Sequence, residues 1–179
     1  QAPDADLDFF ESAYKENFGT RPTSLREDFA GTCYLATRWV ERRAGNRAIC
    51  VDIDPEPLAW GQARHIDKLR PAQKKRIQVM CGDVRGTPST KVHVVVAQNF
   101  SFCTFKTRAA LLAYFVAARS NLLDNGIFVL DIYGGPDAQN ALKEKTKHRG
   151  FTYVWEQGIY DAITSEMLCH IHFRFPDGS

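Results

Sequence analysis

The sequence lacks the features that mark several common classes of protein. Its five cysteines form no C-x-x-C pair, which excludes the usual zinc and thioredoxin-type motifs. The N-terminus has no signal-peptide pattern, and no apolar run approaches the length that spans a membrane. The formal net charge is only +2, and the densest basic run, Arg70–Arg76, is typical of a solvated helix end. We therefore expect a cytoplasmic protein with reduced cysteines and with neither a membrane nor a nucleic acid as partner.

Metal ligands at recognisable spacing are also scarce. The five histidines are scattered along the chain, and only His170 and His172 alternate on a predicted strand. Neither has a carboxylate or a cysteine nearby at a spacing typical of metal ligands. We predict that the protein has no metal site.

Two kinds of apolar pattern alternate along the chain. Short apolar runs predict strands, and stretches with apolar residues every three to four positions predict helices. The predicted strands are Ser24–Phe29, Arg47–Asp54, Arg76–Asp83, Lys91–Phe100 and Ile127–Gly135. The predicted helices are Asp6–Gly19, Gly31–Gly45, Pro55–Leu69, Lys106–Leu123 and a polar surface helix, Pro136–Gly150. The alternation indicates an α/β fold with a doubly wound, mostly parallel sheet.

The pattern changes after residue 150. The segment 151–175 is typical of two strands joined by a turn around Asp161–Ser165, so we expect a C-terminal antiparallel hairpin at one edge of the sheet. The chain starts with Gln1 and stops directly after a strand-like run, so we expect one or both ends to be truncated. We predict a single domain over 1–179, made of an N-terminal helical cap (1–24), an α/β core (25–150) and the hairpin (151–179).

Polar residues follow the carboxyl end of every predicted strand, which is where doubly wound sheets bind their ligands. Asp52 follows the second strand and is placed to accept hydrogen bonds from both hydroxyls of a ribose. Asp54 directly precedes a proline and fits the role of helix cap. Asp83 ends the third strand, where it is either a partner for the exocyclic amine of adenine or an aspartate of a turn.

Three short motifs, in order, resemble the class I S-adenosylmethionine-dependent methyltransferases. They are "EDFAGTC" (27–33), "VDIDP" (51–55) and "CGDVR" (81–85), where the family has an acidic–x–Gly–x–Gly–x–Gly loop, an acidic residue after the second strand and "GD" after the third. The resemblance spans about residues 25–135 and the C-terminal hairpin, and it implies a Rossmann-like methyltransferase fold with S-adenosylmethionine as cofactor. It assigns Glu27 to the acidic position, Gly31 to the middle glycine, Asp52 to the ribose and Asp83 to adenine. The predicted cofactor site is completed by the adjoining residues Phe29, Ile53, Val84 and Asn99.

Phe29 and Cys33 depart from the family pattern, because they replace the two outer glycines. Gly31 is kept where the backbone approaches the ligand most closely. S-adenosylmethionine has no pyrophosphate and does not need the full glycine set of a dinucleotide. Two interpretations of Phe29 remain open: it lines the pocket, or it marks a cofactor site that has been lost.

The reaction implied by the resemblance is methyl transfer to a small-molecule acceptor. Such an in-line displacement depends mainly on positioning, so a catalytic triad is not required. Asn99, after the fourth strand, and Tyr133, after the fifth, are the polar residues that we expect nearest the methyl group. The loop Asn99–Phe102 matches only the two ends of the Asn-Pro-Pro-Tyr motif of amino-directed methyltransferases, so it does not assign the acceptor.

Two other functions fit parts of the sequence. A nicotinamide-dependent oxidoreductase uses a related sheet but carries a fuller glycine loop than "DFAGTC". A methyltransferase-fold module without catalysis, which acts as a binding partner, is supported by Phe29 and Cys33. The sequence gives no indication of the oligomeric state.

Overall fold

We describe residues 3–178 of the chain in a computed structural model; residues 1, 2 and 179, which the expected domain included, lie outside the described part. The chain divides into two compact units, Gln1–Ile132 and Tyr133–Ser179. Between Pro3 and Gly178 every helix is too short or too polar to cross a lipid bilayer.

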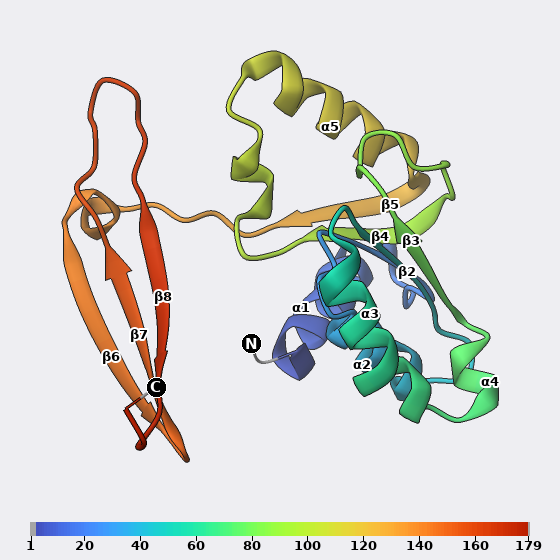
Figure 1. The fold of residues 1–179 in the computed structure, drawn as a ribbon. Coiled ribbons are helices and arrows are strands. Elements are labelled where there is room, and N and C mark those ends of the chain that lie inside the picture. Colours follow the sequence, from blue (N-terminus) through green and yellow to red (C-terminus); the bar gives the residue numbers. More distant parts are fainter. Residues whose placement is uncertain (1–2, 179) are drawn as a thin grey trace. The chain divides into compact units, whose positions relative to one another are not determined.

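The first unit is built on a five-stranded parallel sheet with the strand order β3-β2-β1-β4-β5 (Figure 1). The strands are β1 (Ser24–Asp28), β2 (Arg47–Asp52), β3 (Ile77–Cys81), β4 (Val92–Ala97) and β5 (Leu122–Leu130). The order reverses between β1 and β4, so the sheet has a switch point beside β1. The doubly wound, parallel arrangement predicted from the sequence is confirmed.

Helices cover both faces of this sheet. They are α1 (Pro3–Phe18), α2 (Tyr34–Arg42), α3 (Pro55–Arg64), α4 (Pro71–Lys74) and α5 (Arg108–Ser120), with 3-10 turns η1 (Ile66–Lys68) and η2 (Ser101–Thr104). Figure 1 shows α5 over one face, and α1, α2 and α3 over the other. Asp54 caps α3 by accepting a hydrogen bond from the Glu56 N–H at 2.9 Å, as its position before Pro55 predicted.

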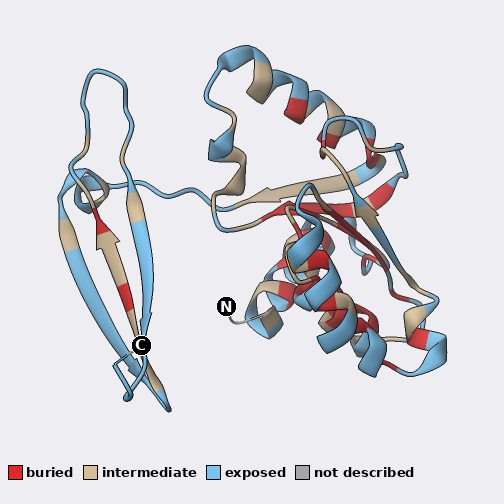
Figure 2. Cartoon of the chain, viewed as in Figure 1, coloured by how far each residue is buried: buried red, intermediate tan, exposed pale blue. Residues whose placement is uncertain are grey.

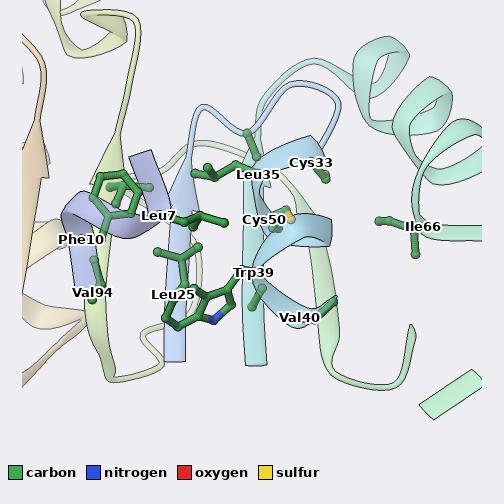
Figure 3. Packing of buried hydrophobic residues seen from close by; sticks show 14 of the residues in the cluster. Leu7, Phe10, Leu25, Cys33, Leu35, Trp39, Val40, Cys50, Ile66 and Val94 are labelled. Carbon is green, nitrogen blue, oxygen red and sulfur yellow. The ribbon is translucent and has the colours of Figure 1, made fainter. Parts of the chain in front are cut away.

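The core follows the alternation of side chains along the buried strands. In β4, Val94 and Val96 pack under α1 and α2, whereas Val95 and Ala97 pack under α5. The first cluster also contains the fully buried Trp39 (Figure 3). Burial is concentrated along the sheet and on the inner sides of its helices (Figure 2). Because β1 and β4 are covered on both faces, they are held rigidly beneath the loops that follow them.

The connection from α5 to β5 differs from the prediction. The predicted strand begins at Ile127, but β5 begins at Leu122, so it also includes Asp124–Gly126. The register with β4 shifts between Val92 and Val94, whose partners are Leu122 and Ile127. The extra residues of β5 therefore form a bulge, which allows the strand to begin earlier than predicted.

The second unit is a separate three-stranded antiparallel sheet, with the order β6-β7-β8. Its strands are β6 (Leu142–His148), β7 (Phe151–Gln157) and β8 (Cys169–Arg174), preceded by the 3-10 turn η3 (Pro136–Gln139). The predicted pairing of the last two strands is confirmed, but their expected place at an edge of the parallel sheet is wrong within residues 3–178. The predicted polar helix over Pro136–Gly150 is also wrong, because its second half pairs with β7 as β6.

Candidate functional site

The loop after β1 turns through three residues in the left-handed conformation. Phe29, Gly31 and Cys33 have φ values of 57°, 51° and 55°. These are the three positions at which the sequence motif has glycines, and two of them here carry side chains. A non-glycine residue in this conformation costs about 1–2 kcal/mol. The loop therefore keeps the path of a glycine-rich loop without its glycines, at a cost that the surrounding structure must offset.

Hydrogen bonds to β2 and within the loop hold this path. The Ala30 N–H donates to the Val51 carbonyl at 2.9 Å, and the Gly31 N–H donates to Asp52 Oδ2 at 2.7 Å. The Cys33 N–H donates back to the Ala30 carbonyl at 2.8 Å, and the Cys33 side chain is fully buried. The strained residues are thus fixed by backbone contacts and by burial in the core.

Asp52 joins the loop to the start of α3. Its Oδ2 accepts the hydrogen bond from Gly31, and its Oδ1 accepts one from the Asp54 N–H at 2.9 Å. Each carboxylate oxygen has a second lone pair, so Asp52 can accept two further hydrogen bonds. The side chain lies half-buried at the carboxyl end of β2. A partly exposed carboxylate with both oxygens oriented by backbone N–H groups is suited to bind a pair of hydroxyls.

Glu27, the next-to-last residue of β1, is a half-buried acid beside Asp52. Its Oε2 accepts a hydrogen bond from the Ala36 N–H of α2 at 3.2 Å. Burial raises the pKa of Glu27 to about 8, the bond from Ala36 opposes the rise, and the charge of Asp52 adds to it. A pKa in this range favours the protonated carboxyl at neutral pH, and a cation placed beside it would favour its ionisation.

The raised pKa of Glu27 should make the wild-type protein less stable as pH rises from about 5 to about 8. Replacing Glu27 with glutamine should abolish this loss. The folded state holds the proton up to about pH 8, whereas the unfolded state releases it near the ordinary value of 4.5. Stability therefore falls as pH rises through this window, by at most about 1.4 kcal/mol per pH unit. Free energies of unfolding of both proteins, measured by urea titration from pH 5 to pH 8.5, check this prediction.

The comparison of the two proteins isolates Glu27 from the histidines. Burial lowers the pKa values of His65 and His93, so these groups make stability rise with pH in both proteins. Parallel stability curves for the wild type and Glu27→Gln would contradict the assignment of a raised pKa to Glu27.

Phe29 lines two cavities. One, of about 320 Å³, is lined by Phe29, Ile53, Gly82, Asp83, Val84, Arg85, Thr104 and Phe105. The other, of about 230 Å³, is lined by Glu27, Asp28, Phe29, Ala30, Gly31, Thr32, Tyr34, Gln98 and Asn99. The predicted cofactor residues thus gather at the carboxyl ends of β1–β4, with Phe29 lining both cavities and Asp52 holding the loop that both share.

The ring of Phe29 packs into the core beneath α5. Its centroid lies 5.5 Å from that of Tyr114 and 6.0 Å from that of Phe105, in tilted or edge-on arrangements. Because both cavities remain open beside this ring, Phe29 acts as a wall of the site.

Asp83 forms an ion pair with Arg85, which lines the same cavity. Arg85 approaches its carboxylate through Nε at 3.0 and 3.1 Å and through Nη2 at 2.5 Å, and the Arg85 N–H also donates to it at 2.8 Å. This ion pair lowers the pKa of Asp83 below its ordinary value. From the sequence, Asp83 is predicted to be a contact for adenine or an aspartate of a turn, and no pattern pairs it with Arg85.

A buried polar network, also missed by the sequence analysis, holds the Asp83 loop against β1. Arg26 is fully buried and donates from Nε to Asp28 Oδ1 at 2.7 Å. Its Nη2 donates to the Thr87 hydroxyl at 2.7 Å and to the Val84 carbonyl at 3.3 Å. The remaining members are Asn121, which accepts from Arg26 Nη1 at 3.1 Å, and Tyr114, which donates to Asp28 Oδ2 at 3.1 Å.

The loop after β4 is fixed by Asp131, at the end of β5. The carboxylate of Asp131 accepts hydrogen bonds from the N–H groups of Asn99 and Phe100 at 2.7 and 2.6 Å. Both residues are left-handed, with φ of 57° and 44°, and the Asn99 side chain is exposed at the mouth of the smaller cavity. Tyr133, the other predicted catalytic residue, begins the second unit, where its hydroxyl donates to Gln157.

No set of three His, Cys, Asp or Glu side chains between residues 3 and 178 is arranged to hold a metal ion.

Comparison by sequence finds no protein-family model and no curated protein that matches the chain. Comparison of structures finds several methyltransferases with similar folds. The CcbJ methyltransferase from Streptomyces caelestis superposes with a TM-score of 0.74 at 15% identity, covering 100% of this chain and 74% of that one. CalS10, an amino pentose methyltransferase from Micromonospora echinaspora in its S-adenosylmethionine-bound form, superposes with a TM-score of 0.70 at 12% identity. The match covers 97% of this chain and 76% of CalS10. The sugar N-methyltransferase KedS8 from a Streptoalloteichus species superposes with a TM-score of 0.66 at 16% identity. The match covers 98% of this chain and 74% of KedS8.

These likenesses show that the chain has the Rossmann-like fold of S-adenosylmethionine-dependent methyltransferases, as the sequence motifs implied.

Proposed function

We propose that this protein binds S-adenosylmethionine at the carboxyl ends of β1–β3 and transfers its methyl group to a small-molecule acceptor. The observation that carries the proposal is the left-handed path of Phe29, Gly31 and Cys33, anchored by Asp52 between two cavities. Non-glycine residues held in strained backbone conformations cluster at ligand-binding and active sites, which supports a binding role for this loop.

The two cavities suit the two ends of the cofactor. The larger, largely apolar cavity with Ile53, Val84 and Asp83 is suited to adenine, and Asp52 to the ribose hydroxyls. The smaller, polar cavity with Glu27 and Gly31 is suited to the charged methionine portion. Phe29 then separates the two as a wall, which favours the interpretation that it lines a working site.

When bound, S-adenosylmethionine would supply an electrophilic methyl group on a sulfonium sulfur. The chain's own contribution is to hold the acceptor in line with that methyl group and to exclude water. Asn99 lies at the mouth of the smaller cavity on a loop fixed by Asp131, which supports a role for its amide in orienting an acceptor. Tyr133 stays a prediction from the sequence alone, because it belongs to the second unit.

A small molecule is the acceptor class that we favour. Two of the similar structures are named as an amino pentose methyltransferase and a sugar N-methyltransferase. The net charge of +2 gives no electrostatic support for a nucleic acid. Product formation from labelled S-adenosylmethionine, screened over sugars, amino sugars and peptides, identifies the acceptor.

Asp52→Asn should weaken binding of S-adenosylmethionine and of its demethylated product by about 10- to 100-fold. The substitution removes the charge from a group that would accept two hydroxyl hydrogen bonds, each stabilising by about 1.5–3 kcal/mol when one partner is charged. Calorimetric titration of both ligands measures the effect. Asp54→Asn is the matched control, because it makes the same change two residues away, at an exposed carboxylate that caps α3 and does not bond the loop after β1.

The titration also separates the rival functions. Binding of NAD without S-adenosylmethionine would support an oxidoreductase and overturn the proposal. A folded protein that binds neither would be the non-catalytic module. Equal affinities of Asp52→Asn and Asp54→Asn would show that the ligand sits elsewhere.

A further inference from the structure

Arg85 lies across the cavity that we assign to adenine. Its guanidinium is held by the Asp83 carboxylate through Nε and Nη2, at 2.5–3.1 Å. Its Cζ also lies 4.8 Å from the centroid of the Phe105 ring, a cation–π distance. All three residues line the same cavity.

These two contacts are the ones that a purine would need from this cavity. A carboxylate accepts hydrogen bonds from an exocyclic amine as it does from the N–H groups of a guanidinium. An aromatic face stacks with a flat purine as it does with a flat guanidinium. The Arg85 side chain thus occupies both recognition elements of the adenine subsite.

We infer that the guanidinium of Arg85 is an internal placeholder for adenine. It must be displaced from the subsite when the ligand binds. The inference rests on the proposed function, because it takes the ligand to be an adenine nucleoside. Arg85 lowers the affinity of the site and fills the subsite with a polar group while the cofactor is absent. The aliphatic part of the side chain then remains as a rim of the cavity after the guanidinium has moved.

The turn that carries Arg85 allows the side chain to move without the backbone. The N–H groups of Gly86 and Thr87 donate to the Asp83 carbonyl at 3.0 and 3.1 Å, and buried Arg26 holds Val84 and Thr87 from below. The side chains of Arg85 and Asp83 are both more than a third exposed. An exposed ion pair of this kind is weak and sensitive to salt, so a ligand can replace it.

Replacing Arg85 with methionine should tighten binding of S-adenosylmethionine by about 5- to 10-fold, because methionine keeps an apolar stem but cannot hold Asp83. Adenosine should bind more tightly by a similar factor. Because adenosine is uncharged, the adenosine titration excludes the possibility that the variant binds more tightly only because a positive charge has been removed. Raising the salt concentration should bring the adenosine affinities of the two proteins closer together, since it weakens the Arg85–Asp83 pair only in the wild type.

Arg119→Met is the matched control, because Arg119 is exposed in the last turn of α5 and lines neither cavity. Unchanged affinity in Arg85→Met would overturn the placeholder role. Weaker affinity would also overturn it, and would show that Arg85 helps to hold the bound purine. If folded wild type and variant bind neither ligand, the proposed function fails and the inference with it; if both bind equally well, only the inference fails.

Discussion

Arg26→Leu is expected to lower the free energy of unfolding by about 3–5 kcal/mol, the usual cost of removing one partner of a buried ion pair. Arg26 is fully buried and makes four hydrogen bonds, and its loss leaves the buried Asp28 carboxylate without a counter-ion. Burial already raises the pKa of Asp28, and Arg26 opposes that rise. In the variant Asp28 should therefore take up a proton, so the loss should be smaller at pH 5 than at pH 8.

Two further variants make this test specific. Arg38→Leu removes an arginine whose ion pairs with Asp4 and Glu41 are exposed, and it should cost less than about 1 kcal/mol. The double variant Arg26→Leu with Asp28→Leu should recover part of the loss, because no buried charge is left unpaired. Urea unfolding of all four proteins measures the effects. Equal losses for Arg26→Leu and Arg38→Leu would show that the buried network does not stabilise the fold.

The network also shows what could not be predicted from the sequence. The alternation of apolar residues predicts the strands, but it assigns charged residues such as Arg26 to exposed positions. Arg26 is buried because its partners come from distant parts of the chain: Thr87 follows β3, and Asn121 follows α5. No local pattern encodes such a set, and each partner alone looks like an ordinary turn or helix-end residue.

The predictions for the cofactor site rest on where residues stand relative to the strands. Asp52 ends β2 and Asp83 follows β3 by two residues, and parallel strands bring their carboxyl ends to one edge of the sheet. Phe29 and Cys33 could be aligned with glycines by the motif, but side chains alone gave no reason to expect a left-handed backbone there. That conformation is set by hydrogen bonds to Val51 and within the loop.

The polar segment that became β6 illustrates the limit of local propensity. Ala141, Leu142 and the lysines and glutamate that follow favour a helix by propensity alone. The same lysines, at positions 143, 145 and 147, alternate with other residues and so share one face of a strand. Pairing with β7 along the whole of β6 decides the outcome, since strand preference depends on the partner strand more than on the segment itself.

Gly61→Ala should abolish measurable cofactor binding, a loss of more than about 100-fold, and should cost about 1–3 kcal/mol of stability. A Cβ at Gly61 of α3 would lie 2.1 Å from the carbonyl oxygen of Thr32, and 2.5 and 2.8 Å from its C and Cα atoms. All three are backbone atoms of the loop between Gly31 and Cys33, so the loop itself must move. A misplacement of 1 Å can cost about two orders of magnitude in the rate of a reaction that depends on positioning, and we expect cofactor binding by this loop to be comparably sensitive.

Gly45→Ala is the matched control, because no atom lies within 4 Å of the added methyl group and the site is remote from Thr32. Titration with S-adenosylmethionine and urea unfolding should give near wild-type values for this variant. Hydrogen exchange should show faster exchange at the Gly31 and Cys33 amides in Gly61→Ala only, because their bonds to Asp52 and Ala30 depend on the loop's position. A folded Gly61→Ala that binds the cofactor as tightly as Gly45→Ala would show that the left-handed loop does not form the binding site.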